Sequence, residues 1–513
     1  MREAIVAANT ATTADVINFD PVVFSIPRII SLSGSELVIA ANSNLTVNGP
    51  GAALLTISGN NQSRILFVSE FAVASLNGFR ITDGNGVGTW GGQGGAVKLF
   101  NFCDVTMANL IISNSRAPNQ GGALAIGNGT LTATNTVFSN NRATSSASGI
   151  HISQSVVTLI NSIIADNPES GGIGMNGGTL NLQGSTISNN VSAGDGGGLA
   201  NGGGTVNIIG STISGNRAHQ GGGGISTING TMNVTGSNVI NNISIYGGGG
   251  GIKTNGRLNV TDSNISNNID NSPGIGGGGI YSGAQIVTLN ISRTTIVGNS
   301  TTGPGGGIYN EGTGQNADFS MIISDSLIAN NSATQEGGGI ITGATKFSNV
   351  TVYGNSSLME IGGIFSGGSS ELYNCTIAYN RATNAGGVEN AGILKTRNTI
   401  IANNKATVGT SNDWLGWFDS YGYNLVKDRT GLLYGGPIET GLIFGADPML
   451  GPLRNNGGPT YTAALRPGSP AIDQGASLDP VVPNDQRGMA RPFDFVSITN
   501  AVQGNGSDMG AFE

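Results

Sequence analysis

Two patterns of apolar and polar residues alternate along residues 94 to 406. The first is a cluster of glycines that ends in an apolar residue, as in Gly196 to Leu199 and Gly337 to Ile340. This apolar residue recurs every 23 to 32 residues, and mostly every 24 to 28. A fixed period of this length is typical of repeat proteins, in which each unit stacks on the next.

The second pattern places an apolar residue three positions before an asparagine, as in Ile213 and Asn216. The apolar position is filled in all twelve repeats, and asparagine follows in eleven, with Ser115 as the exception. Asparagine tolerates left-handed backbone, and stacked amides can bond to one another. We therefore predict a structural ladder at one corner of the coils, formed by Asn141, Asn167, Asn190, Asn216, Asn242, Asn268, Asn299, Asn331, Asn355, Asn380 and Asn404.

Both patterns indicate short strands joined by tight corners. Apolar columns would point inward and stack like on like, and glycine would supply the positive φ and close backbone approach of another corner. Units of about 26 residues are too short for propeller blades, and leucine-rich repeats would show helices and a leucine pattern. We predict an all-β fold, a right-handed parallel β-helix (a solenoid) of about 12 regular coils over 94–406.

The two ends of the chain depart from the repeat. Residues 2 to 9 contain strong helix formers, so 1–27 is predicted to be an N-terminal cap with one short helix. Residues 28–93 alternate in β fashion and are expected to form irregular initial coils. After residue 406 the repeat stops and proline and aromatic residues become frequent, so 407–513 is interpreted as a C-terminal cap and tail.

Composition narrows the class of protein. Glycine provides 86 of 513 residues without a Gly-X-Y period, and only 10% of residues are charged against an ordinary 38% hydrophobic. Collagen and disordered chains are therefore excluded. The net charge of −8 without a basic cluster argues against nucleic acid, and no apolar run is long enough for a membrane span. Cys103 and Cys375 are about ten repeats apart, so no disulfide is expected.

The ends also carry family resemblances. Residues 2–5, 7–9 and 16–20 resemble the opening of the CSLREA domain, without its leading Cys-Ser-Leu. Residues 447–453, 456–460, 468–473, 485–488, 491–492 and 508–513 are similar to the choice-of-anchor Q domain, and the middle resembles the glycine-rich repeats of polymorphic outer-membrane proteins. These resemblances imply a secreted, cell-surface β-helix without assigned catalytic residues. A signal peptide and any anchor are expected outside the given chain.

Other proteins with this fold cleave polysaccharides, so we looked for paired carboxylates. Asp262 and Asp325 share one column with Arg293 between them, but most other members of that column are asparagine or glycine, typical of a turn. His151 and His219 lack the spacing of metal ligands and are predicted to lie on the surface. We predict no catalytic residues, no metal and no cofactor; calcium in the loops is compatible with the sequence but not indicated.

One column holds more functional promise. The residue after each glycine-cluster apolar position should face outward, and from the middle of the chain it becomes aromatic, aliphatic or charged. This outward column is Lys253, Tyr281, Tyr309, Ile341, Phe365 and Glu389. It could form an exposed band for self-association or sugar stacking, or a self-stacked ladder covered by loops. Trp414 and Trp417 are divided between cap core and binding, with cap core favoured.

The sequence thus favours a non-catalytic extracellular or cell-surface protein, structural or adhesive, with a homo-oligomer, a polymer or a surface glycan as partner. The alternatives are a polysaccharide lyase or glycosidase, or a non-catalytic carbohydrate-binding protein. Two carboxylates in one groove near a Lys or Arg would favour the enzyme.

Overall fold

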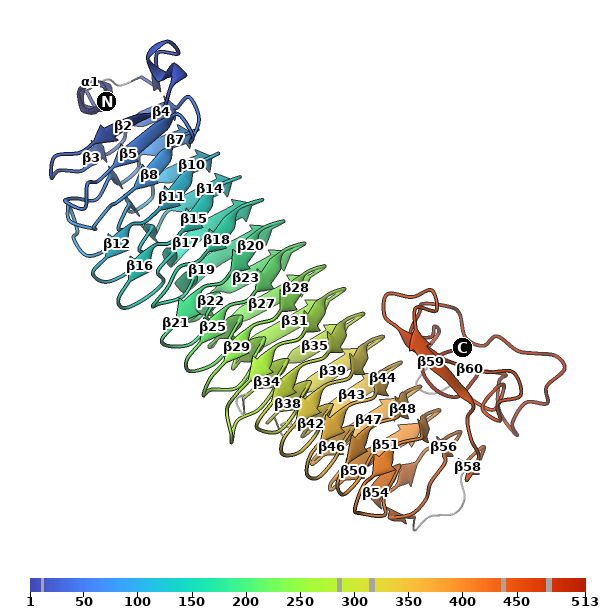
Figure 1. The fold of residues 1–513 in the computed structure, drawn as a ribbon. Coiled ribbons are helices and arrows are strands. Elements are labelled where there is room, and N and C mark those ends of the chain that lie inside the picture. The colour runs from blue at the N-terminus through green and yellow to red at the C-terminus, as the bar shows by residue number, and fades with distance from the viewer. Residues whose placement is uncertain (11–12, 284–287, 313–318, 435–439, 477–481) are drawn as a thin grey trace. The chain divides into compact units, whose positions relative to one another are not determined.

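The computed structural model describes residues 1–10, 13–283, 288–312, 319–434, 440–476 and 482–513. The chain divides into two units, Met1–Asn233 and Val234–Glu513. Both are built from stacked parallel strands, and together they contain about 15 turns with almost no helix (Figure 1). The predicted all-β, right-handed parallel β-helix is confirmed.

Each coil contains up to four short strands. In unit 1 a representative coil comprises β22 (Leu199–Asn201), β23 (Thr205–Ile209), β24 (Thr212–Ser214) and β25 (Arg217–Ala218). The strands of this coil pair in parallel with those of the coil before it: β19 (Ile173–Gln183), β20 (Thr186–Ser188) and β21 (Val191–Ser192). Ile187 lies beside Ile213, and both side chains are buried. The apolar columns read from the sequence therefore form the interior.

The glycine clusters are required by the close approach of coils. Gly196 has a φ of +64°, which L side chains rarely adopt. A Cβ on the next residue, Gly197, would lie 2.4 Å from the carbonyl oxygen of Gly223. Both positions exclude larger residues, so the cluster fixes one corner of the coil.

The first coils of unit 1 are more regular than predicted. Helix α1 (Arg2–Ala8) contacts β3 (Leu37–Ile39) and buries Ile5. Parallel pairing already joins β1 (Asp15–Asn18) to β4 (Asn44–Asn48), β4 to β7 (Val73–Asn77), and β7 to β10 (Asp104–Ala108). A second ladder joins β3, β6 (Leu66–Val68), β9 (Val97–Leu99) and β13 (Leu124–Gly127).

In unit 2 the coils reach beyond residue 406. Strand β54 (Trp414–Trp417) pairs with β50 (Val388–Asn390), and β56 (Leu425–Val426) joins β52 (Ile400–Ala402) to β58 (Ile443–Phe444). Trp414 continues the inward position of Val388, and both are fully buried. Inward apolar residues thus continue the coil after the glycine and asparagine patterns have ended.

The remaining described residues of unit 2, 445–476 and 482–513, are called the C-terminal segment here, and they fold back along the coils. Strands β59 (Leu450–Arg454) and β60 (Thr462–Leu465) form an antiparallel pair beside the coils (Figure 1). Gln486 donates to the Ser326 carbonyl and accepts from the Thr351 hydroxyl, and the Ala511 N–H donates to the Thr376 hydroxyl. Met509 is fully buried against Ile400 and other coil residues. The segment therefore covers a flank of the coils rather than only their end.

Candidate functional site

The asparagine ladder is an internal structural element. In unit 2 the amide of Asn299 donates to the Asn331 side-chain oxygen at 3.0 Å and to the Ile265 carbonyl at 3.0 Å, and the Asn299 backbone N–H donates to Asn331 as well. The same bonds link Asn141, Asn167 and Asn190 in unit 1. Left-handed backbone was expected at the ladder residues but lies one position earlier, as at Asn140 and Asn267 with a φ of 55°.

The two residues that complete the ladder were not recognised from the sequence. Ser115, the exception to the pattern, donates its backbone N–H to Asn141, and its hydroxyl accepts from the Gly84 N–H. Asp413 accepts from both the backbone N–H and the amide of Asn404. Burial raises the pKa of Asp413 to about 6. A carboxylate therefore serves as the last acceptor, where the sequence pattern had stopped.

The predicted outward column forms in register but is largely covered. Its six members lie side by side on successive coils, from Lys253 to Glu389. Tyr281 is only 9% exposed and Ile341 only 7%, while the other four are half-buried. The Tyr281 and Tyr309 ring centres are 5.8 Å apart.

The cover comes from the neighbouring turns. A Cβ on Gly248 would lie 3.1 Å from the Tyr281 ring, so this turn passes directly over the ring. Burial, followed by the Glu311 carboxylate, raises the pKa of the Tyr281 hydroxyl. The binding hypothesis needs a continuous exposed band, and this band is interrupted at Tyr281 and Ile341. The sequence pattern shows which way a strand residue points, but it does not show which turn crosses over it.

The acidic column of the sequence is a row of turns. Arg293 makes two bonds to Asp262, of 2.7 and 2.8 Å, and this pair is about half exposed. Asp325 accepts instead from the Asn349 amide at 2.9 Å. All three residues of the column have a φ between 46° and 50°. The column thus combines left-handed turns with a surface ion pair, in agreement with the turn interpretation.

Two predictions about single side chains are wrong. His151 was expected on the surface but is 5% exposed, and burial, helped by Lys98, lowers its pKa to about 4. His219 is exposed. Trp414 lies in the coil interior, whereas Trp417, which was assigned to the cap core, is 62% exposed. His151 takes the outward position of β17 (Ile150–Ile160), but the Ser146 hydroxyl of the preceding turn lies 3.3 Å from its ring nitrogen and covers it. Trp417 is the last residue of its strand, and the sequence did not show which way it faces.

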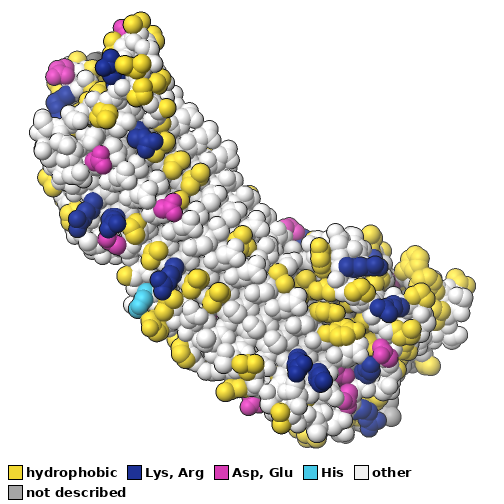
Figure 2. Space-filling model, viewed as in Figure 1, with side chains coloured by type: hydrophobic (Ala, Val, Ile, Leu, Met, Phe, Trp, Pro, Cys, Tyr) yellow, Lys and Arg dark blue, Asp and Glu magenta, His cyan; other side chains and the backbone are white. Residues whose placement is uncertain are grey.

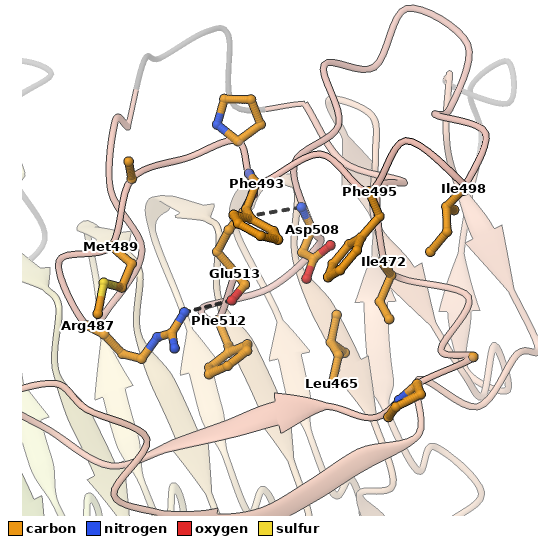
Figure 3. A pocket seen from close by; sticks show the side chains of 14 residues that line it. Leu465, Ile472, Arg487, Met489, Phe493, Phe495, Ile498, Asp508, Phe512 and Glu513 are labelled. Carbon is orange, nitrogen blue, oxygen red and sulfur yellow. Dashed lines mark hydrogen bonds between the residues drawn. The ribbon is translucent and has the colours of Figure 1, made fainter.

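A cavity of about 720 Å³ lies within the C-terminal segment (Figure 3). It is lined mostly by apolar side chains: Leu465, Ile472, Met489, Phe493, Phe495 and Phe512. Its charged members are Arg487, Asp508 and Glu513. The Arg487 guanidinium lies 3.7 Å from the centre of the Phe512 ring. The sequence analysis did not single out these residues as a site.

Carboxylates and arginines do meet beside this cavity. Arg491 pairs with Glu513 at 2.8 Å, and Arg487 pairs with Asp485 at 2.7 Å; all four side chains are mostly buried. Glu513 also accepts from the N–H groups of Phe493 and Asp508. These bonds occupy the carboxylates of Asp485 and Glu513, and they tie the last residues to the rest of the segment.

Asp508 also lines the cavity, but it differs from Asp485 and Glu513 in its hydrogen-bond partners. One carboxyl oxygen accepts from the Asp473 N–H at 2.9 Å, and Figure 3 shows the group between Phe493 and Phe495. Burial raises its pKa to about 7, with further contributions from Glu513 and Asp473. A carboxyl group in this state can hold or release a proton near neutral pH, but its nearest carboxylate partner is already bonded to Arg491.

Three further findings concern the described part of the chain. No three His, Cys, Asp or Glu side chains come together there in a way that could hold a metal ion. None of its helices is long and apolar enough to cross a membrane. Cys103 and Cys375 are free and buried.

Comparison with known proteins supports the fold. Residues 94–243 match the family described as a right-handed beta helix region. No curated protein matches the chain. The matched residues are those with the alternating glycine and asparagine patterns, and the resemblances of the two ends stay predictions.

Proposed function

We propose that this chain is a non-catalytic structural protein of the cell surface or extracellular space, which self-associates through its C-terminal segment. The extracellular location rests on the resemblance of the two ends. The continuous internal ladders support a rigid scaffold, because each buried amide is bonded to the coils on both sides. The sparse surface charge is also compatible with close packing of copies (Figure 2).

The observation that carries the proposal is the exposed apolar rim of the C-terminal cavity. Phe493 is 63% exposed, Met489 50%, Phe495 45% and Ile498 37%, and all four line the cavity. Figure 2 shows hydrophobic side chains gathered on this segment. Contiguous apolar surface of this kind marks interaction sites on soluble proteins. A second copy is the occupant that we propose, in keeping with a surface polymer.

The bonding of the carboxylates supports a non-catalytic role. A glycosidase needs one carboxyl group as acid and a second, free carboxylate as base or nucleophile. Here Asp485 and Glu513 are engaged by arginines and backbone N–H groups, and the Asp473 carboxylate near Asp508 accepts from the Phe495 N–H. Asp508 therefore has no free carboxylate beside it to act as the base or nucleophile.

Light scattering of the full chain over a range of concentrations tests self-association. We expect a concentration-dependent assembly that Phe493→Ser with Met489→Ser abolishes. Val408→Asp is the matched control, because Val408 is 80% exposed in the same unit but does not line the cavity. A wild-type chain that stays monomeric at every soluble concentration, or a rim variant that assembles normally, would overturn the proposal.

Incubation with pectin, alginate, xylan and β-glucan tests the non-catalytic part. We expect no new reducing ends and no unsaturated products. Turnover that Asp508→Asn abolishes would restore the enzyme interpretation.

A further inference from the structure

Three exposed aromatic residues in the first coils of unit 1 have left-handed backbone. Phe71, Trp90 and Phe102 have φ angles of 58°, 55° and 57°. Their side chains are 54%, 63% and 62% exposed. Bulky residues rarely adopt positive φ, because the Cβ approaches the following carbonyl oxygen. Core packing does not compensate for this conformation, since more than half of each side chain lies in solvent.

Neighbouring coils show what this turn normally holds. Val73 and Asp104 are paired with each other on neighbouring strands. Phe71 lies two residues before Val73, and Phe102 lies two residues before Asp104. The same position is Asn42 before β4 and Asn128 before β14 (Thr130–Thr134), with φ angles of 63° and 51°. Asparagine suits such a turn at little cost. Phenylalanine in two successive coils therefore replaces the residue that the backbone favours.

The rings form two adjoining stacks. Phe71 and Phe102 have ring centres 5.2 Å apart and planes within 15° of each other. Trp90 lies on Phe100 at 5.2 Å with an angle of 22°. Phe100 and Phe102 are two residues apart, so their Cα atoms lie within roughly 7 Å. The side chains of these two neighbouring pairs, Phe71, Trp90, Phe100 and Phe102, are called the aromatic platform below.

A buried ion pair holds the loop that carries Trp90. The Arg64 side chain is fully buried, bonds to Glu36 at 2.7 Å, and donates to the carbonyls of Thr89 and Trp90 at 2.7 and 3.3 Å. Glu36 also accepts from the Thr89 N–H at 2.7 Å. Burying two charges is costly unless their hydrogen bonds are satisfied. Here the bonds go to the loop, so the pair acts as a positioning device for Trp90.

We infer that this aromatic platform binds the flat apolar face of pyranose rings in an uncharged polysaccharide. Sugar rings present C–H groups that pack on exposed aromatic faces, and polar groups at the edge fix their orientation. Such groups are present, because the Asn128 amide bonds to the Asn101 oxygen at 3.1 Å beside Phe102. The inference does not depend on self-association through the C-terminal segment.

Charge at this corner favours a neutral ligand over a uronate. Glu70 directly precedes Phe71, and Asp104 follows Phe102 by two residues and is exposed. The nearby Lys98 is buried, and its ammonium group bonds to Gln93 at 2.7 Å. Burial lowers the pKa of Lys98 to about 8. An acidic polysaccharide would thus meet carboxylates at this edge of the platform.

The double variant Phe71→Asn with Phe102→Asn tests the site without threatening the fold, because asparagine is the residue of the neighbouring turns. Binding of cellohexaose, xylohexaose and hexagalacturonate to the full chain is measured by calorimetry. We expect wild type to bind at least one neutral hexaose, and the double variant to bind it at least tenfold more weakly with an unchanged or higher melting temperature. Trp90→Ala should weaken the same binding.

Tyr379→Asn is the matched control in unit 2. Tyr379 has a φ of 59°, is 41% exposed and has its ring centre 5.0 Å from that of Tyr353, but it lies outside the platform. We expect this variant to bind as wild type does. Absence of neutral hexaose binding, binding of hexagalacturonate alone, or equal binding by the double variant would overturn the inference. The inference would also be overturned if the double variant lost self-association but still bound sugar, because the platform would then serve as a contact for a second copy.

Discussion

Arg64 and Glu36 form a 2.7 Å ion pair whose side chains are almost completely buried in unit 1. Burial lowers the pKa of Arg64, and the Glu36 carboxylate opposes this shift. The pair connects the coils that contain β3 and β6 to the loop of Thr89 and Trp90. It bonds to the carbonyls of both loop residues and to the Thr89 N–H, which take part in no strand pairing. Two charges inside the fold thus determine where an exposed tryptophan lies.

Removing one member of this pair should be costly. Arg64→Met leaves the Glu36 carboxylate buried without its partner, and we expect a loss of about 3 to 5 kcal/mol in the free energy of unfolding. Urea denaturation followed by circular dichroism measures this loss. Arg64→Met combined with Glu36→Leu should recover much of the stability but leave Trp90 more accessible to acrylamide quenching. A loss below about 1 kcal/mol for the single variant would contradict a positioning pair.

The asparagine ladder should contribute more to stability than the turn residue beside it. Asn299→Ala removes bonds to Asn331 and Ile265 and leaves buried groups unsatisfied, so we expect a loss of about 2 to 4 kcal/mol. Asn267→Gly is the control, because Asn267 is exposed with a φ of 55° and glycine accepts that backbone. Thermal unfolding of both variants decides the point, and equal losses would show that the ladder has no special role.

The raised pKa of Asp508 predicts a pH dependence. The folded state holds the proton more tightly than the unfolded chain, so this group favours folding most below pH 4. That contribution is lost as the pH rises from about 4 to about 7. Limited proteolysis of the C-terminal segment between pH 4 and 8 measures the effect. Asp508→Asn should reduce the slope, while Asp413, whose pKa is about 6, retains its own contribution in both proteins. An unchanged slope in the variant would assign the dependence to other groups.

The covered outward column should behave as packing. We expect Tyr281→Ala to cost about 2 to 4 kcal/mol of stability, because a buried aromatic side chain is lost. Tyr281→Ala with Tyr309→Ala should leave hexaose binding and self-association unchanged. Stability and both binding measurements are made on the same preparations. A double variant that stays stable but loses hexaose binding or self-association would show that this column is a binding surface.

The repeat made much of the fold predictable. Ile187 and Ile213 occupy the same position in successive coils, and an asparagine follows each of them by three residues, as Asn216 follows Ile213. A residue type that recurs in this way can be assigned to one position of the stacked coil. The prediction failed where the repeat did. Trp414 continues a core column without the glycine pattern, and the C-terminal segment covers a flank through contacts of Gln486 that no periodicity announces.

The candidate sites were less accessible to sequence reasoning. The direction of Tyr281 follows from strand alternation, but the turn that passes over it does not. Phe71 and Phe102 can be matched to the asparagine turns only after the strand register is known. The turn between Leu99 and Asp104 has one more residue than the equivalent turn between Ile126 and Thr130 in the next coil. Cavities among irregular loops, such as the one beside Asp508, leave no pattern in the chain.

Electron cryo-microscopy of the native particle tests the structural account most directly. We predict β-helices in repeated contact with one another through the C-terminal segment, with the rim of Met489 and Phe493 inside each contact. Native particles in which the β-helices are separate and the rim is exposed to solvent would contradict it.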